Sequence, residues 1–318
     1  MKIFRHHEDV PDSCKGAVVA IGNFDGVHRG HQSLIAHAAA LAKAQGAPLG
    51  VLAFEPHPQK FFRPETESFR LTPFRSKARL LAERGVEVLY ALLFDATMAQ
   101  KASEEFVRDV LVSGLGVRGV VVGADFRFGK GRAGDAAFLV EAGRQYGFAV
   151  EIFNTVIAHD TQKISSSEIR TALKEGKPEV AARLLGHWWT IEGRVEQGDA
   201  RGRELGFPTA NMQLDGYLKP AFGIYAARAT IFENEKPAGA YDGVASLGIR
   251  PMFETDSPLL ETYLFDFSGD LYGKHLAVEL VAYLRPEMKF DSVGTLKAQM
   301  TKDCDEASTL LRHLKDRF

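Results

Sequence analysis

The chain has 318 residues, more than a single hydrophobic core usually serves, so we expect two domains. Hydrophobic residues make up 45% and charged residues 25%, with a net charge of -2, which argues against a disordered chain and against a strongly basic nucleic-acid binder. Only two cysteines occur, Cys14 and Cys304, and no C-x-x-C pair, so neither a disulfide framework nor a structural zinc site is indicated.

The beginning of the chain, MKIFRHHEDVPDSCKG, lacks the continuous apolar run of a signal peptide. No stretch approaches the roughly 20 apolar residues of a membrane span. We therefore expect a cytoplasmic protein with no membrane partner, in which both thiols are inert.

Residues 1–185 alternate short apolar runs with helix-like stretches, a pattern typical of a parallel sheet with crossover helices. The expected strands are Ala17–Ile21, Leu49–Phe54, Val86–Phe94, Gly119–Gly123 and Phe148–Phe153. The expected helices are Ser33–Gln45, Ser76–Glu83, Ser103–Leu111 and Asp135–Tyr146. Polar clusters follow the first, second and fourth strands, at the edge where open parallel sheets bind ligands. The pattern predicts a Rossmann-like α/β domain.

From residue 186 to 318 the pattern changes, and short apolar segments recur between glycine, proline and asparagine. The expected antiparallel strands are Thr190–Val195, Phe222–Phe232, Ala240–Leu247, Leu260–Phe267 and His275–Leu284. A small β-barrel is the simplest way to close so many short strands. The stretch from Ser292 to about Lys315 has helical length and apolar spacing, so we expect a terminal helix covering the barrel.

The densest polar signal is Gly22-Asn23-Phe24-Asp25-Gly26-Val27-His28-Arg29-Gly30-His31, between an expected strand and an expected helix. It is neither a dinucleotide fingerprint nor a P-loop. Its glycines let the backbone approach a ligand, and the helix start near Gly30 offers free N–H groups to phosphate. Because His28 and His31 are three apart, both imidazoles can face one side and donate to one phosphate. Two other interpretations are a satisfied loop histidine and a metal site.

In this element the chain resembles the bacterial bifunctional riboflavin kinase/FAD synthetases, whose variant of the histidine motif of adenylyl- and cytidylyltransferases reads G-x-F-D-G-x-H-x-G-H. The resemblance covers essentially the whole chain. Three further elements match the family in order and spacing: Phe54-Glu55-Pro56-His57-Pro58, residues 122–129 (VGADFRFG) and residues 164–170 (ISSSEIR).

The resemblance implies that the first domain transfers AMP from ATP to FMN, giving FAD and pyrophosphate, with Mg²⁺ present. Because the FMN phosphate is already anionic, no general base is required, and the site acts by positioning and charge stabilisation. His28 and His31 are the expected catalytic residues. The expected ATP or phosphate contacts are Gly22, Phe24, Asp25, Gly30, Ser165, Ser166 and Arg170. Flavin binding is expected from Asp125, Phe126 and Phe128, although the two phenylalanines equally suit a buried core.

The last of these elements departs from the family pattern, which has threonine and commonly arginine where this chain has Ser167 and Glu168. Ser165 with Glu168 also fits a capping box at a helix start, which would explain both residues without a ligand. Arg170 is the stronger candidate for a phosphate contact.

The second domain carries Gly202-Arg203-Glu204-Leu205-Gly206-Phe207-Pro208-Thr209-Ala210-Asn211, which resembles the riboflavin kinase motif. The resemblance implies that Gly202, Arg203, Gly206 and Thr209 bind ATP. Thr209 and Asn211 can reach Mg²⁺ with a hydroxyl and an amide oxygen, although such residues also satisfy local turns. The 5′-hydroxyl of riboflavin is a poor nucleophile, so a general base is useful, and the family's strand carboxylate corresponds to Glu261. A strand glutamate can equally lie on an exposed face.

Arg285 and Phe290, at the entry to the last helix, match the family where they could border the flavin ring. Ser246, Met252 and Tyr263 depart from the family's usual asparagine, threonine and histidine. These departures concern the shape of the flavin pocket and leave the reaction unchanged.

Two alternatives remain: a nucleotidyltransferase for another phosphorylated acceptor with a non-catalytic barrel, or a barrel that binds nucleic acid. The C-terminal half holds more acidic than basic residues, which argues against nucleic acid. We therefore expect small-molecule partners (riboflavin, FMN and ATP), while the oligomeric state is left open.

Overall fold

The computed structural model describes all residues except 155–163, 198–201, 203–204, 235, 250–257 and 315–318. The chain forms two compact units. Met1–Glu67 and Thr72–Ser165 make the first unit, and Ser68–Leu71 with Ser166–Phe318 make the second. No helix within the described residues is both long enough and apolar enough to cross a membrane.

The first unit is built on a six-stranded parallel sheet in the order β1-β4-β3-β2-β5-β8. Its strands are β1 (Lys2–Phe4), β2 (Val18–Ile21), β3 (Leu49–Glu55), β4 (Val88–Leu93), β5 (Gly119–Gly123) and β8 (Ala149–Phe153). The central strands are apolar at every position because both faces are covered. The predicted Rossmann-like domain is confirmed; among the strands of its six-stranded sheet, only the edge strand β1 was not foreseen.

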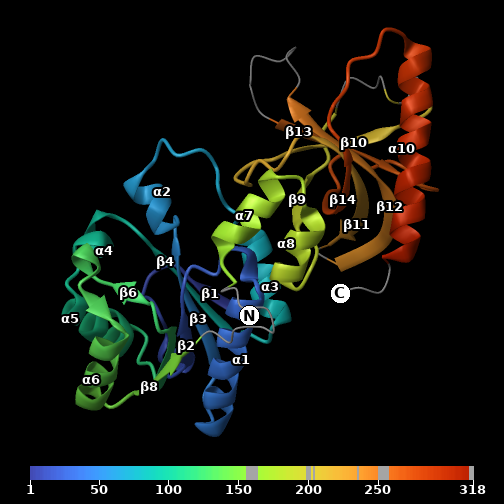
Figure 1. The fold of residues 1–318 in the computed structure, drawn as a ribbon. Coiled ribbons are helices and arrows are strands. Elements are labelled where there is room, and N and C mark those ends of the chain that lie inside the picture. Colours follow the sequence, from blue (N-terminus) through green and yellow to red (C-terminus); the bar gives the residue numbers. More distant parts are fainter. Residues whose placement is uncertain (155–163, 198–201, 203–204, 235, 250–257, 315–318) are drawn as a thin grey trace. The chain divides into compact units, whose positions relative to one another are not determined.

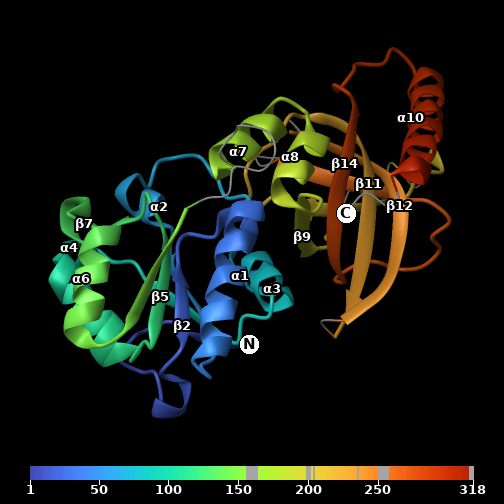
Figure 2. The same ribbon diagram turned by 60° about the horizontal axis from the view of Figure 1, so that its bottom comes forward.

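Helices cover both faces of this sheet (Figures 1 and 2). On one face α1 (Arg29–Ala44) and α3 (Phe74–Glu83) enclose one apolar core. On the other, the π-helix Phe106–Gly114 and α6 (Ala136–Tyr146) enclose another. Shorter elements complete the unit: α2 (Pro58–Phe62), α4 (Ala96–Gln100), α5 (Ser103–Glu105) and the hairpin of β6 (Arg127–Phe128) with β7 (Gly134–Asp135).

The second unit is a six-stranded antiparallel sheet in the order β10-β13-β12-β11-β14-β9. Its strands are β9 (Thr190–Arg194), β10 (Thr209–Gln213), β11 (Gly223–Glu233), β12 (Lys236–Ile249), β13 (Pro258–Leu264) and β14 (His275–Arg285). A bridge between Glu196 and Asn211 joins the two ends of the sheet, which closes it into the predicted barrel. The helix α10 (Val293–His313) packs on β11, β12 and β14, so the predicted covering helix is confirmed.

Two further helices, α7 (Ser166–Lys174) and α8 (Pro178–Leu185), pack on the barrel core through Ile169, Leu173 and Leu185. The segment Ser68–Leu71 joins them there, and the Leu71 carbonyl accepts a hydrogen bond from Trp189 Nε1 at 2.8 Å. By packing, the main segment of the second unit begins at Ser166, earlier in the chain than the expected functional boundary after Leu185.

Candidate active sites

Three of the predicted motifs follow strands that are neighbours in the first sheet. β3 is followed by Pro56-His57-Pro58, β2 by the Gly22–His31 element and β5 by Asp125 with Phe126. Because β3, β2 and β5 are adjacent and parallel, their carboxyl ends meet at one edge. Residues that are far apart in the sequence therefore share one ligand-binding edge.

The turn after β2 adopts an unusual backbone. Phe24 and Val27 have φ angles of 51° and 41°, in the left-handed region, and Gly26 has 81°. Both non-glycine side chains are buried, with 0% and 1% exposure. Burial of these side chains helps to hold a conformation that isolated residues rarely adopt.

Thr72 holds this turn from a distant part of the chain. Its Oγ1 accepts a hydrogen bond from Gly26 N at 2.9 Å, and its own N–H donates to Asp25 Oδ1 at 3.0 Å. Asp25 and Thr72 are both buried. Asp25 therefore has a structural partner inside the unit, and its expected phosphate contact stays a prediction.

His28 and His31 lie against each other at the start of α1. Their rings stack with centroids 3.6 Å apart and an interplanar angle of 16°. His28 is the N-cap, and its Nδ1 accepts a hydrogen bond from His31 N at 3.3 Å. A Cβ on Gly30 would lie only 3.2 Å from His28 Cε1, which explains the glycine. The expected shared orientation of the two imidazoles is found.

The same unit contains an ion pair with little exposure to solvent. Lys77 Nζ on α3 lies 2.9 Å from Glu55 Oε1 at the end of β3, and the two side chains are 3% and 10% exposed. Burial, His28 and the Lys77 ammonium together lower the pKa of His31 well below its usual value. Thr72 and Lys77 were missed from the sequence because neither is near a recognised motif.

The expected flavin residues lie on and beside the β6–β7 hairpin. Phe126 and Phe128 stack with centroids 5.6 Å apart, and Phe128 is buried against Phe106. Asp125 is exposed at the end of β5. Phe128 thus belongs to the core, as the alternative interpretation allowed.

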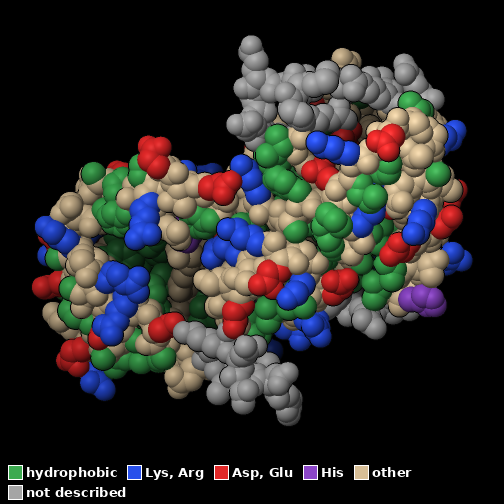
Figure 3. All heavy atoms as spheres, turned by 45° about the horizontal axis from the view of Figure 1, so that its top comes forward, with side chains coloured by type: hydrophobic (Ala, Val, Ile, Leu, Met, Phe, Trp, Pro, Cys, Tyr) green, Lys and Arg blue, Asp and Glu red, His purple; other side chains and the backbone are tan. Residues whose placement is uncertain are grey.

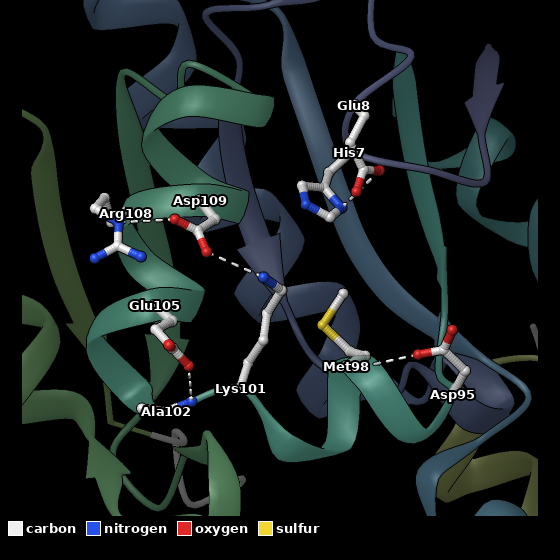
Figure 4. A network of polar contacts seen from close by, with 9 residues as sticks. All are labelled: His7, Glu8, Asp95, Met98, Lys101, Ala102, Glu105, Arg108 and Asp109. Carbon is white, nitrogen blue, oxygen red and sulfur yellow. Dashed lines mark hydrogen bonds and ion pairs between the residues drawn. The ribbon is translucent and has the colours of Figure 1, made fainter.

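The hairpin rests on the segment around Lys101. The Lys101 carbonyl accepts from Lys130 N at 2.8 Å, and its ammonium lies 3.0 Å from Asp109 Oδ2 on the π-helix (Figure 4). Arg108 Nε also donates to Asp109, so both cations lower the pKa of that carboxyl. A Cβ on Gly129 would lie within 3 Å of Ser103, so hairpin and segment pack tightly.

An aromatic group that the sequence did not single out lies beside the carboxyl edge. Phe61 and Phe62 of α2 each pack on Phe94, which in turn packs on Phe54 at the end of β3. Phe62 is 64% exposed. Alternation along one strand cannot reveal such a group, because its members come from β3, from α2 and from the loop after β4.

The helix start expected at Ser165 is found, since α7 begins at Ser166. Arg170, in the second turn of α7, donates from Nε to the Phe69 carbonyl at 2.8 Å, and its guanidinium lies 5.3 Å from the Phe69 ring. Ser166 and Arg170 thus belong to the second unit, while Ser165 ends the first.

In the second unit, the predicted kinase residues share one face of adjacent strands. Asn211 on β10 is the direct partner of Glu261 on β13, and Glu261 is in turn the partner of Ser246 on β12. Ala210, Met212 and Leu260 alternate with them and fill the barrel interior. Thr209, opposite Tyr263, is on the same face as Asn211. The amide, the carboxylate and the hydroxyl are therefore neighbours on the outer face of the barrel.

The amide oxygen of Asn211 is buried and, within the described residues, has no hydrogen-bond partner. Such an orphaned acceptor indicates a missing donor or cation. Together with the Thr209 hydroxyl and the Glu261 carboxylate it offers the oxygen ligands that Mg²⁺ prefers. Within the described part of the chain no three His, Cys, Asp or Glu side chains form a metal cluster, so phosphate and water oxygens would complete the shell.

In the loop that precedes β10, backbone conformation and steric contacts explain the two glycines Gly202 and Gly206. Gly206 has a φ of 89°, and a Cβ on Gly202 would lie 2.4 Å from the Phe207 carbonyl oxygen. Arg203 and Met252, two residues of the sequence predictions, lie outside the described residues.

A second carboxylate, missed from the sequence, lies near Glu261. A Cβ on Gly248 would lie 2.1 Å from Glu287 Oε1, so the Glu287 carboxylate occupies the space beside this glycine. Gly248 pairs with Leu259, two residues before Glu261 on β13. Burial and the nearby Glu261 raise the pKa of Glu287.

Arg285 is bound to the terminal helix. Its Nε and Nη2 donate to the two carboxylate oxygens of Asp303 at 2.9 and 2.7 Å, and its Nη1 donates to the Pro286 carbonyl. The Phe290 ring lies 5.9 Å from the guanidinium. This gives Arg285 a structural role, while its expected flavin contact stays a prediction.

Comparison with known proteins agrees with this division. The FAD synthetase family model matches residues 10–168, and the riboflavin kinase family model matches residues 185–311. The fold and the two sites thus define a two-domain enzyme that joins a nucleotidyltransferase sheet to a kinase barrel.

Relatives that match nearly the whole chain identify its family within this class of two-domain enzymes. The bifunctional riboflavin kinase/FMN adenylyltransferase of Escherichia coli (strain K12) is 41% identical over 289 residues, which is 91% of each chain. That of Pseudomonas fluorescens is 40% identical over 311 residues, or 98% of each. The chain belongs to the bifunctional riboflavin kinase/FMN adenylyltransferase family, and the expected membership is confirmed.

A solved structure shares the complete fold. A crystal structure described as a macrolide-efflux protein from Streptococcus pneumoniae aligns with a TM-score of 0.83 at 31% identity, covering 95% of this chain and 96% of that one.

Proposed function

We propose that the barrel phosphorylates riboflavin to FMN on the face of Thr209, Asn211 and Glu261. We propose further that the parallel-sheet domain transfers AMP from ATP to FMN at the edge of His28 and His31. The enzyme as a whole is bifunctional, as both family matches in order support. The observation that carries the kinase assignment is the direct pairing of Asn211 with Glu261.

In the kinase reaction, Glu261 accepts the proton of the riboflavin 5′-hydroxyl as its oxygen attacks the γ-phosphorus of ATP, and ADP leaves. Thr209 and Asn211 would hold Mg²⁺, which supplies charge neutralisation for the phosphates. Because Asn211 is buried, solvent water has little access to its side of the Thr209–Asn211–Glu261 site. The loop containing Gly202 and Gly206 contributes backbone to the ATP site.

In the adenylyl transfer, an FMN phosphate oxygen attacks the α-phosphorus of ATP, and pyrophosphate leaves. His28 and His31 donate hydrogen bonds to the phosphate as charge develops, and the N-terminus of α1 adds backbone N–H groups. Phe126 and Asp125 lie at the same edge and contribute to the flavin side.

Purified protein incubated with riboflavin, ATP and Mg²⁺, with FMN and FAD separated by chromatography over time, tests both activities together. His28→Ala should abolish FAD formation, while FMN accumulates. The matched control is His37→Ala, an exposed histidine on the same helix. Formation of FAD at an unchanged rate by His28→Ala would remove this site assignment.

The proposal also assigns the adenylyltransferase domain to residues 1–185 and the kinase domain to residues 186–318. It places the protein in the cytoplasm, with small molecules as its partners. On the face drawn in Figure 3, acidic and basic side chains are interspersed, without a broad basic field for nucleic acid. A gel shift with single-stranded DNA tests the alternative of a nucleic-acid-binding barrel.

A further inference from the structure

Tyr263 lies on β13 two residues beyond Glu261, so the two side chains are on the same face of the strand. Thr209 of β10 is the ladder partner of Tyr263, just as Asn211 is the partner of Glu261. Side chains that are opposed in an antiparallel pair are neighbours on their face of the sheet. Tyr263 therefore stands beside the hydroxyl that we expect to reach Mg²⁺ and the ATP phosphates.

The Tyr263 ring contacts Phe207, the residue before Pro208. The ring centroids are 5.3 Å apart with an interplanar angle of 74°, which is the edge-to-face arrangement that aromatic pairs favour. Both side chains are half-buried, and the Tyr263 ring also packs on Phe265, just after β13, at 5.9 Å. Because Pro208 restricts the backbone on both sides of the bond that joins it to Phe207, the position of Phe207 constrains that of Thr209.

The backbone of Phe207 also contacts the glycine that begins the motif. Its N–H donates a hydrogen bond to the Gly202 carbonyl at 2.8 Å. A Cβ on Gly202 would lie 2.4 Å from the Phe207 carbonyl oxygen and 3.4 Å from Thr209 Oγ1, so Gly202 is close to both residues. Phe207 therefore joins the strand of Tyr263 to two of the residues expected to bind ATP.

We propose that Tyr263 is a positioning residue for the kinase reaction: through its ring contact with Phe207 it holds Gly202 and Thr209 in the arrangement that receives ATP. An arrangement that exists before ATP arrives costs less conformational entropy on binding, so the contact lowers the KM for ATP. From the sequence we expected Tyr263 to shape the flavin pocket, whereas in the fold it contacts the residue that leads into Pro208 and Thr209. The inference rests on the ATP site proposed at Thr209.

Tyr263→Leu removes the ring and keeps an apolar side chain. In riboflavin phosphorylation, measured as the sum of FMN and FAD, we expect the KM for ATP to rise by about three- to tenfold, the equivalent of one aromatic contact. The KM for riboflavin should be unchanged. Tyr263→Phe should keep the wild-type kinetics, because the contact uses the ring and not the hydroxyl. The matched control is Tyr241→Leu, which removes another half-buried edge-to-face pair of the barrel, with Phe267 at 5.0 Å.

A double-mutant cycle separates positioning from a general weakening of the barrel. If Tyr263 acts through Phe207, the KM for ATP in Tyr263→Leu/Phe207→Leu should be no higher than in the worse single variant. Additive effects, an unchanged KM for ATP in Tyr263→Leu, or an equal rise in Tyr241→Leu or Tyr263→Phe would overturn the proposal. Unchanged phosphorylation in Thr209→Val would instead defeat the ATP site proposed on this face, whatever the effect of Tyr263→Leu.

Discussion

Asn211 and Glu261 are direct partners across the β10–β13 ladder, so their side chains stand next to each other on one face of the sheet, and the amide oxygen of Asn211 has no partner within the described residues. Opposed side chains in an antiparallel pair have Cβ atoms about 4.5–5.5 Å apart. One phosphoryl-transfer site can therefore use both groups.

Glu261→Gln should lower riboflavin phosphorylation by on the order of 10²–10⁴, because the amide cannot accept the hydroxyl proton. FAD formation from supplied FMN should be unchanged. The control is Glu233→Gln, an exposed barrel glutamate paired with Lys274. Kinase activity that survives intact in Glu261→Gln would contradict the role of general base.

Asn211→Leu should separate function from stability. Because the amide oxygen has no partner within the described structure, its replacement removes a buried unsatisfied acceptor, and the free energy of unfolding should not fall. Kinase activity should nevertheless fall by about tenfold or more, the equivalent of one lost ligand interaction. Urea unfolding measures the stability, and an assay of FMN formation measures the kinase activity. A large loss of stability would show that the amide is structural.

Thr72→Val should weaken adenylyl transfer by loosening the turn that carries His28. The variant keeps the side-chain shape but removes the acceptor of Gly26 N–H, which should cost about 1–3 kcal/mol of stability. Thr72→Ser should restore FAD formation, and the exposed Thr97→Val is the control. Equal FAD rates in Thr72→Val and wild type would rule out this positioning role.

Stability should depend on pH through His31, whose pKa in the folded chain is lowered from 6.5. Below about 6.5 the unfolded chain binds a proton that the folded chain does not, so the free energy of unfolding falls as pH falls. The slope contributed by this residue is at most about 1.4 kcal/mol per pH unit. Urea unfolding followed by circular dichroism at pH 7.5 and 5.5 should show a smaller difference in His31→Phe than in wild type or His37→Phe.

Asp303→Asn tests whether Arg285 acts through α10 or through flavin. It replaces the carboxylate partner of the partly buried guanidinium by a neutral amide, and we expect a loss of about 3 kcal/mol. Both tryptophans of the chain, Trp188 and Trp189, lie in the second unit, so their fluorescence reports on its unfolding. A raised KM for riboflavin with unchanged stability would favour the flavin contact instead.

The elements of the molecule were largely predictable, because their signals are local. Apolar runs such as Gly119–Gly123 identify buried strands, and the spacing of His28 and His31 at a helix start already places their rings on one side. The short β10 was missed, because its five residues were taken only as a motif. The helices α7 and α8 lie on either side of Gly176. Their hydrophobic periodicity does not show to which of the two domains they belong.

Local patterns in the sequence predicted two domains, the order of most helices and strands along the chain and the residues of the motifs. The folded chain was needed to show which residues each motif residue meets: Asp25 meets Thr72, Glu55 meets Lys77, and Asn211 meets Glu261. Hydrogen bonds and ion pairs depend on the distance between atoms in space. Parallel and antiparallel pairing bring together residues whose separation along the chain leaves no periodic trace.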